Sequence, residues 1–172
     1  MRACTALIAI LLSGPVAADE LMTSITDRLS LMKPVAAWKQ ARGVPVEDRA
    51  REEVVLAKAA ENAEAEGIDP ATVRPFFAAQ IEAAKDIQRC WIAEWAQGAA
   101  APPEDVPDLK ADIRPKLLSL GQQILGGIKT DLAAGESLSE RGGPAAPIAC
   151  LDDAYWQAIR DALGQVRLKD TG

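Results

Sequence analysis

Histidine is absent from this 172-residue sequence. Its absence excludes Ser-His-Asp triads, Cys-His pairs and most zinc sites, so any catalysis must depend on other side chains. Long apolar runs are also scarce. There is one near the N-terminus, and no other segment is long and apolar enough to span a membrane. A surplus of positive charge is lacking too. The net charge is −6 at pH 7, so no nucleic-acid partner is expected.

The one apolar run lies at the start of the chain. Arg2 precedes apolar residues 3–12, and small residues lead up to Asp19, which is the layout of a cleaved secretory signal. A first core helix is the alternative, but a Gly-Pro pair breaks the run before it could span a bilayer. We therefore predict a signal peptide over residues 1–18 and one domain over residues 19–172. The mature protein would be periplasmic or secreted and free of the membrane.

Cysteine is scarce as well, with three residues in the chain. Cys4 would leave with the signal peptide, so that Cys90 and Cys150 remain. An even pair of cysteines in an exported protein suggests a disulfide. Two buried thiols are the alternative, because the sequence does not supply the geometry that a disulfide requires.

Strand signals are almost absent, whereas helix signals recur along the mature chain. Pro34 predicts a kink, because proline cannot donate to the backbone ladder. Asp69-Pro70 is typical of an N-cap followed by proline at the first helical position. We expect an all-α, single-domain bundle of about five helices, over residues 20–40, 48–67, 69–97, 108 or 112 to 135, and 151–168, with a linker over 98–107.

Two cations share one face of the first expected helix. Arg28 and Lys39 are eleven residues apart, which on an α-helix is three turns plus about 20°. Ile25, Met32 and Val35 lie on that same face, which would normally pack against other helices. Cations that point inward need anionic partners. The pattern therefore predicts an anion pocket inside the bundle.

Further polar side chains lie in the next two helices. The segment 45–48 predicts a turn into the second helix, whose first turn then holds Arg51 and Glu52. Gln88 is an amide that can donate two hydrogen bonds. It shares its face of the third helix with the apolar residues Phe77, Ile81, Ala84 and Trp95.

Several motifs occur in an order that matches a known family. They are Arg28-Leu29, Pro34-Val35-Ala36-Ala37-Trp38-Lys39, Pro45-Val46-Glu47-Asp48-x-x-Arg51-Glu52, Ile68-Asp69-Pro70, Phe76-Phe77-x-x-Gln80-Ile81 and Ile87-Gln88. In these motifs the chain resembles the all-helical chorismate mutases, and specifically their secreted, gamma-type branch. The resemblance covers residues 21–95 well, is thinner from 107 to 125, and adds little over the last forty residues.

The reaction that this resemblance implies suits a protein without histidine. Chorismate rearranges to prephenate in a concerted pericyclic step that needs no nucleophile, metal or cofactor. The protein must hold the substrate in a reactive geometry and stabilise negative charge that grows on the ether oxygen. By resemblance, Lys39 reaches a carboxylate and the ether oxygen, and Gln88 donates to that oxygen from the other side. These two are the expected catalytic residues.

The remaining site residues are expected to bind the dicarboxylate substrate. By resemblance, Arg28 and Arg114 hold carboxylates, since guanidinium groups bind carboxylates through paired donors. Arg51 completes the cationic wall, and Glu52 fixes the ring hydroxyl together with the backbone of Asp48. Arg114 has the thinnest support, because little more than its immediate neighbours aligns its segment. Chorismate is the expected partner, with no cofactor, and a homodimer is left open.

Each of these side chains also has a structural interpretation. Arg28 and Lys39 could be long cations at the edge of a core. Arg51 could belong to a solvated face, and Gln88 could be a core amide bonded to the backbone. Asp48 could be an N-cap alone, and we expect it to be an N-cap as well.

Two other functions fit the same features. An isochorismate-pyruvate lyase on the same scaffold would use similar cations, and a periplasmic helical binding protein would only hold a ligand. The secretion signal and the segment 48–52 favour the mutase. The chain departs from the family pattern at Ala84, where relatives often carry Ser or Thr, and at Val55, where some secreted relatives are polar.

Overall fold

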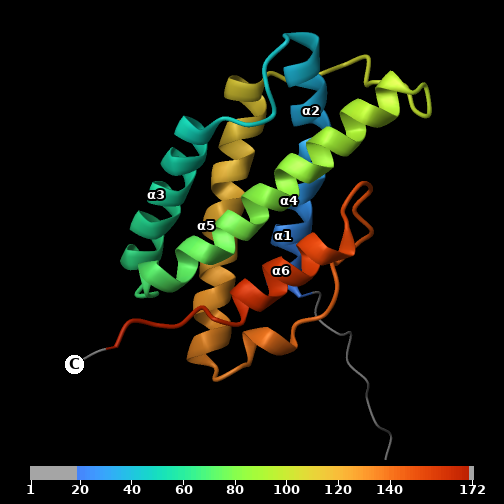
Figure 1. Ribbon diagram of the computed structural model, residues 1–172. Helices are drawn as coiled ribbons and strands as arrows, with labels where there is room; N and C mark the ends of the chain where they lie inside the picture. Colours follow the sequence, from blue (N-terminus) through green and yellow to red (C-terminus); the bar gives the residue numbers. More distant parts are fainter. Residues whose placement is uncertain (1–18, 171–172) are drawn as a thin grey trace, which may run out of the picture.

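The computed structural model describes residues 19–170, which form an all-α bundle (Figure 1). The predicted signal peptide, residues 1–18, lies outside the described residues. The described chain forms six α-helices and two short turns: α1 (Glu20–Ser30), α2 (Met32–Ala41), α3 (Arg49–Ala65), α4 (Pro70–Ala96), a π-helical turn η1 (Leu109–Ile113), α5 (Arg114–Ala133), a 3₁₀ turn η2 (Leu138–Glu140) and α6 (Asp153–Leu163). With α1 and α2 taken as one broken helix, these are the five helices that the sequence predicts.

The kink expected in the first helix is a break at Leu31, between α1 and α2. Pro34 has no N–H to donate to the carbonyl of Ser30, and its ring crowds that carbonyl. The interruption therefore falls almost one turn before the proline. The backbone N–H of Val35 still donates to the carbonyl of Leu31 at 3.2 Å. In Figure 1, α2 continues upward from α1.

The longest helix, α4, organises the bundle. Its N-cap is Asp69, whose carboxylate accepts the backbone N–H of Ala71, and Pro70 occupies the first turn as predicted. Helices α2, α3 and α6 pack against α4, while α1 packs along α5. Figure 1 shows α4 running diagonally across the bundle, with α6 below it and roughly parallel to it. Phe76 and Ile87 of α4 are completely buried in the main apolar cluster.

The linker and the start of the fourth expected helix match the prediction. Residues 97–108 contain no helix. Asp108 then caps η1, because its carboxylate accepts the backbone N–H groups of Lys110 and Ala111, both at 2.8 Å. Pro115 is the second residue of α5 and follows η1 directly, so it cannot donate a backbone hydrogen bond to that preceding turn.

The last helix is shorter than predicted. It begins at Asp153 and ends at Leu163, not at residue 168. The segment after it instead forms an antiparallel bridge between Ile68 and Leu168, flanked by backbone hydrogen bonds of 2.8 and 2.9 Å. This pairing with the α3–α4 turn satisfies backbone groups that the sequence pattern assigned to a helix.

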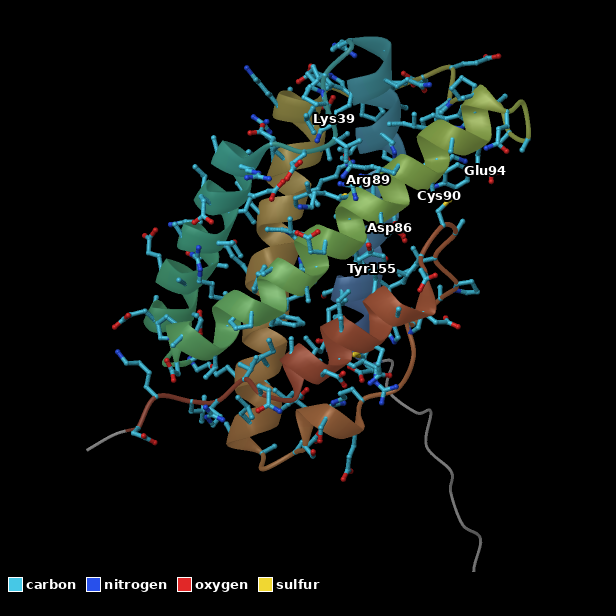
Figure 2. All side chains as sticks on the ribbon, viewed as in Figure 1. Lys39, Asp86, Arg89, Cys90, Glu94 and Tyr155 are labelled. Carbon is cyan, nitrogen blue, oxygen red and sulfur yellow. A yellow bond between two sulfur atoms is a disulfide. The ribbon has the colours of Figure 1, made fainter. Side chains whose placement is uncertain are left out.

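The predicted disulfide is present. Cys90 on α4 and Cys150 in the loop before α6 are bonded, with 5.7 Å between their Cα atoms. Figure 2 shows Cys90 on the side of α4 that faces this loop. The alternative of two buried thiols is therefore wrong. The bridge closes a separation of 60 residues and ties the C-terminal segment to the central helix.

The helices within residues 19–170 do not have the properties of membrane spans. None of the helices there combines the length and the apolar character needed to cross a bilayer.

Candidate active site

One pocket contains all the side chains that the sequence predicts for binding and catalysis. It is bounded by α1, α2, the α2–α3 loop, α3, α4 and the start of α5, all from the same chain. Figure 2 shows Lys39 among the upper ends of α2, α3 and α5. The predicted site residues in its lining are Arg28, Lys39, Asp48, Arg51, Glu52, Gln88 and Arg114.

Arg28 is a half-buried cation without an acidic partner. Its Nη1 donates to the backbone carbonyl of Leu117 at 2.9 Å, and its guanidinium lies 5.7 Å from the ring centre of Phe77. Among the described residues, no carboxylate is within ion-pair distance of it. Burial lowers the pKa of Arg28 to about 10. An anion that entered the pocket would supply the missing partner.

Lys39 is placed by the loop that follows α2. Its Nζ donates to the backbone carbonyl of Val46 at 2.6 Å. An ammonium group has three N–H donors, so two remain for another acceptor. Burial lowers the pKa of Lys39, and the positive charge of Arg114 lowers it further, against the opposing effect of Asp48 and Glu52.

Asp48 and Glu52 form a reciprocal cap at the start of α3. The carboxylate of Asp48 accepts the backbone N–H of Arg51 at 3.0 Å, and the backbone N–H of Asp48 donates to Oε1 of Glu52 at 3.2 Å. The N-cap expected at Asp48 is therefore present. This arrangement also fixes Glu52 at the pocket edge.

Two arginines from different helices, Arg51 and Arg114, line the same pocket. Arg51 is half-buried on α3, and Arg114 is half-buried at the start of α5. Burial lowers the pKa of Arg51, and the charge of Arg114 lowers it further. Arg51 thus lines the pocket while part of it stays in contact with solvent. The thinly supported Arg114 does reach the same pocket as Lys39 within one chain.

Gln88 is buried, with its amide only partly satisfied. Its Nε2 donates to the carbonyl of Ala84 at 2.9 Å and contacts the sulfur of Met32 at 3.5 Å, while Oε1 has no partner. A thioether is a weak acceptor. A ligand oxygen could therefore replace the sulfur without breaking the bond to the backbone.

Two polar residues of the lining were not expected from the sequence. Lys85 is 7% exposed and pairs with Glu52 at 3.4 Å and with Glu82 at 2.7 Å. Burial lowers its pKa, but these two carboxylates outweigh burial and the net shift is upward. Gln80 is 1% exposed and lines the same pocket. Its position between buried apolar residues of α4 was the available sequence signal.

The chemistry of this lining favours an anionic ligand. Cationic side chains outnumber the carboxylates, which are Asp48 and Glu52, and apolar residues such as Val35 and Ile81 complete the wall. Within residues 19–170, no group of three or more carboxylate or cysteine side chains is arranged to hold a metal ion. The donors are all organic groups that can bind carboxylates and hydroxyls directly.

A family model described as chorismate mutase type II matches residues 18–89. This segment includes the pocket residues of α1, α2, α3 and α4. Arg114, on α5, lies beyond it.

Individual proteins match over longer stretches. The secreted chorismate mutase of Yersinia pestis is 34% identical over 152 residues, which cover 84% of this chain and 79% of that protein. The monofunctional chorismate mutase of Enterobacter agglomerans is 33% identical over 122 residues, which cover 70% of this chain but only 65% of that protein. The crystal structure of the Yersinia pestis enzyme superimposes with a TM-score of 0.80 at 32% identity, covering 87% of this chain and 98% of the other.

Proposed function

This chain belongs to the chorismate mutase type II family, and we propose that it converts chorismate to prephenate in the pocket described above. One observation carries the proposal: the pocket has a surplus of cations over carboxylates, so that the half-buried Arg28 is left without an acidic partner. A dicarboxylate substrate would supply the missing negative charge. The cations are Arg28, Lys39, Arg51, Lys85 and Arg114.

Positioning is the first contribution of these groups. Arg28 and Arg114 hold the two carboxylates, and Arg51 adds to the cationic wall. Holding both ends of the substrate favours the folded conformation in which the enolpyruvyl side chain lies over the ring. The apolar residues around them exclude water from the reacting bonds.

Charge stabilisation is the second contribution. As the C–O bond breaks, negative charge grows on the ether oxygen, and Lys39 and Gln88 donate to it. Lys39 has two N–H donors beyond its bond to Val46, and Gln88 has one N–H that now contacts only sulfur. Both donors are held by the backbone before substrate arrives, so little reorganisation is required.

The carboxylate of Glu52 has a separate role. It accepts the ring hydroxyl of the substrate, next to the backbone N–H of Asp48. The ion pair with Lys85 and the bond to Asp48 hold Glu52 in place. Its charge also reduces the repulsion among the cations.

The family membership and the pocket within one chain also bear on the location and assembly of the protein. The protein is exported and processed after Ala18, in keeping with the relatives named secreted chorismate mutases. A homodimer would hold two separate pockets, because Arg114 and Lys39 come from one chain. Activity therefore does not depend on dimerisation. Light scattering on the active protein would give the assembly state.

The test is product identification with the mature protein, residues 19–172. Incubation with chorismate should yield prephenate, with full activity after exhaustive dialysis against EDTA. Incubation with isochorismate should yield no salicylate and pyruvate, which would be the products of a lyase. Binding of chorismate without turnover would indicate a binding protein, and activity lost to EDTA and restored by one metal would contradict the proposed mechanism.

A further inference from the structure

Gln80 is a fully buried amide without a hydrogen-bond partner. The residue is 1% exposed, and neither Oε1 nor Nε2 has a partner among the described residues. Gln88, the other buried amide of the pocket, has at least a backbone acceptor. An amide that leaves water and gains no partner destabilises the folded chain. Its presence in the pocket wall therefore points to a ligand that completes it.

The position of Gln80 gives its amide access to the pocket. Along α4, the pocket is lined at intervals of four residues by Gln80, Ala84 and Gln88. Residues four apart lie on nearly the same face of a helix. Ala84, the middle residue of the three, has only a methyl group. Lys85 also lines this wall, but its ammonium group is paired with Glu52 and Glu82.

Arg28 approaches the same turn of α4. Its guanidinium lies over the ring of Phe77, and Phe77 and Gln80 are neighbours three residues apart on one face of the helix. Arg28 uses Nη1 for the carbonyl of Leu117 and has no carboxylate partner. An unpaired cation and an unpaired amide thus lie on adjacent parts of one wall.

We propose that Gln80 is a substrate-binding residue whose Nε2 donates a hydrogen bond to the carboxylate held by Arg28. The inference rests on the proposed function, and it adds a residue to the carboxylate subsite. A carboxylate has acceptor sites enough for a guanidinium and an amide together. Because the amide is neutral, it strengthens the subsite without adding repulsion to a wall that is already cationic.

The expected kinetic effect is on binding and not on the chemical step. The carboxylate keeps its charge from ground state to transition state, so a group that binds it stabilises both. Gln80→Met keeps nearly the same shape and removes both polar atoms. It should raise KM about tenfold, the order expected for one charge-assisted hydrogen bond, and leave kcat within about threefold.

Stability separates this role from a structural one. If Gln80 awaits a ligand, Gln80→Met should leave the melting temperature of the free protein unchanged or higher, because an unpaired amide is removed. A lower melting temperature together with an unchanged KM would overturn the proposal, since it would show an amide used by the fold. Thermal unfolding followed by circular dichroism gives this measurement.

A second variant and a control complete the experiment. Gln80→Glu should raise KM more than Gln80→Met, because it places a carboxylate opposite the substrate carboxylate. If Gln80→Met does not fold, the KM of Gln80→Glu tests whether Gln80 binds the substrate. Gln122→Met, on the exposed surface of α5, should keep the wild-type KM. Wild-type protein without turnover would refute the proposed function, whereas an active wild type with unchanged KM in both Gln80 variants would refute only the role of Gln80.

Discussion

Lys85 and Glu52 form an ion pair between α4 and α3, with 3.4 Å between Nζ and Oε2. Both side chains are largely buried, at 9% and 20% exposure. The second oxygen of Glu52 accepts the backbone N–H of Asp48 at 3.2 Å. The pair therefore holds the carboxylate of Glu52 at the pocket edge, and it joins two helices that both line the site.

Removing the lysine tests this relationship. Lys85→Met should lower the free energy of unfolding by about 1–3 kcal/mol, because the largely buried Glu52 would lose its charged hydrogen-bond partner. It should also raise KM, since Glu52 would no longer be held for the ring hydroxyl. Urea unfolding and steady-state kinetics measure the two effects.

Lys58→Met is the matched control for that variant. Lys58 pairs with Glu61 on the exposed surface of α3. An exposed pair contributes little, so this variant should change the free energy of unfolding by less than about 1 kcal/mol and leave KM unchanged. Equal effects of the two substitutions would show that the pair in the pocket has no special role.

The alkaline limb of the pH–rate profile should report on Lys39. Burial and the charge of Arg114 lower its pKa below 10.5, so its positive charge is lost as pH rises through that lowered value. The rate kcat/KM should therefore decline at a pH below the usual titration range of lysine. In Lys39→Arg, any remaining activity should persist to higher pH, because a guanidinium keeps its proton. An identical alkaline limb in both proteins would assign the decline to another group.

Processing and the disulfide can be examined together by mass spectrometry. Protein from the periplasm should begin at Asp19 and contain no free thiol. Cys90→Ala with Cys150→Ala should lower the free energy of unfolding by about 2–4 kcal/mol, because the bridge closes a loop of 60 residues in the unfolded chain. Alkylation of two cysteines in the native, non-reduced protein would contradict the bonded state.

Local sequence signals were enough for much of the fold and part of the site. Helix caps such as Asp69 and breakers such as Pro34 act on their own neighbours, so the sequence predicts them. The shared face of Arg28 and Lys39 follows from helical spacing alone. Arg114 is different, because only the family resemblance pointed to it.

Features that depend on distant contacts were missed. One partner of Lys85, Glu82, is three residues away on the same helix, but the other, Glu52, lies 33 residues away on α3. Nothing near Lys85 in the sequence therefore separates it from the exposed lysines. The early end of α6 has a similar cause, since Leu168 pairs with Ile68 one hundred residues before it. Gln80 belongs to the motif Phe76-Phe77-x-x-Gln80-Ile81, but its lack of a hydrogen-bond partner is visible only in three dimensions.

The mechanism itself can be tested at Lys39. If Lys39 stabilises charge on the ether oxygen, Lys39→Ala should lower kcat by at least about a hundredfold, the scale for losing one preorganised donor to a developing oxyanion. If it only binds a carboxylate equally in the ground and transition states, KM should rise while kcat stays nearly unchanged. Steady-state kinetics with chorismate distinguishes these outcomes.

Gln88→Leu provides the parallel test from the other side of the ether oxygen. Leucine keeps roughly the size of the side chain and removes the donor, and the bond that Gln88 makes to Ala84 lies within its own helix, so the fold should survive. We expect a lower kcat for this variant too, with an unchanged circular dichroism spectrum. The contrast with Gln80→Met is informative, because two amides on one helix would then act on different parameters, Gln88 on kcat and Gln80 on KM. Wild-type kcat in both Lys39→Ala and Gln88→Leu would mean that these side chains are structural and that charge stabilisation at the ether oxygen has another source.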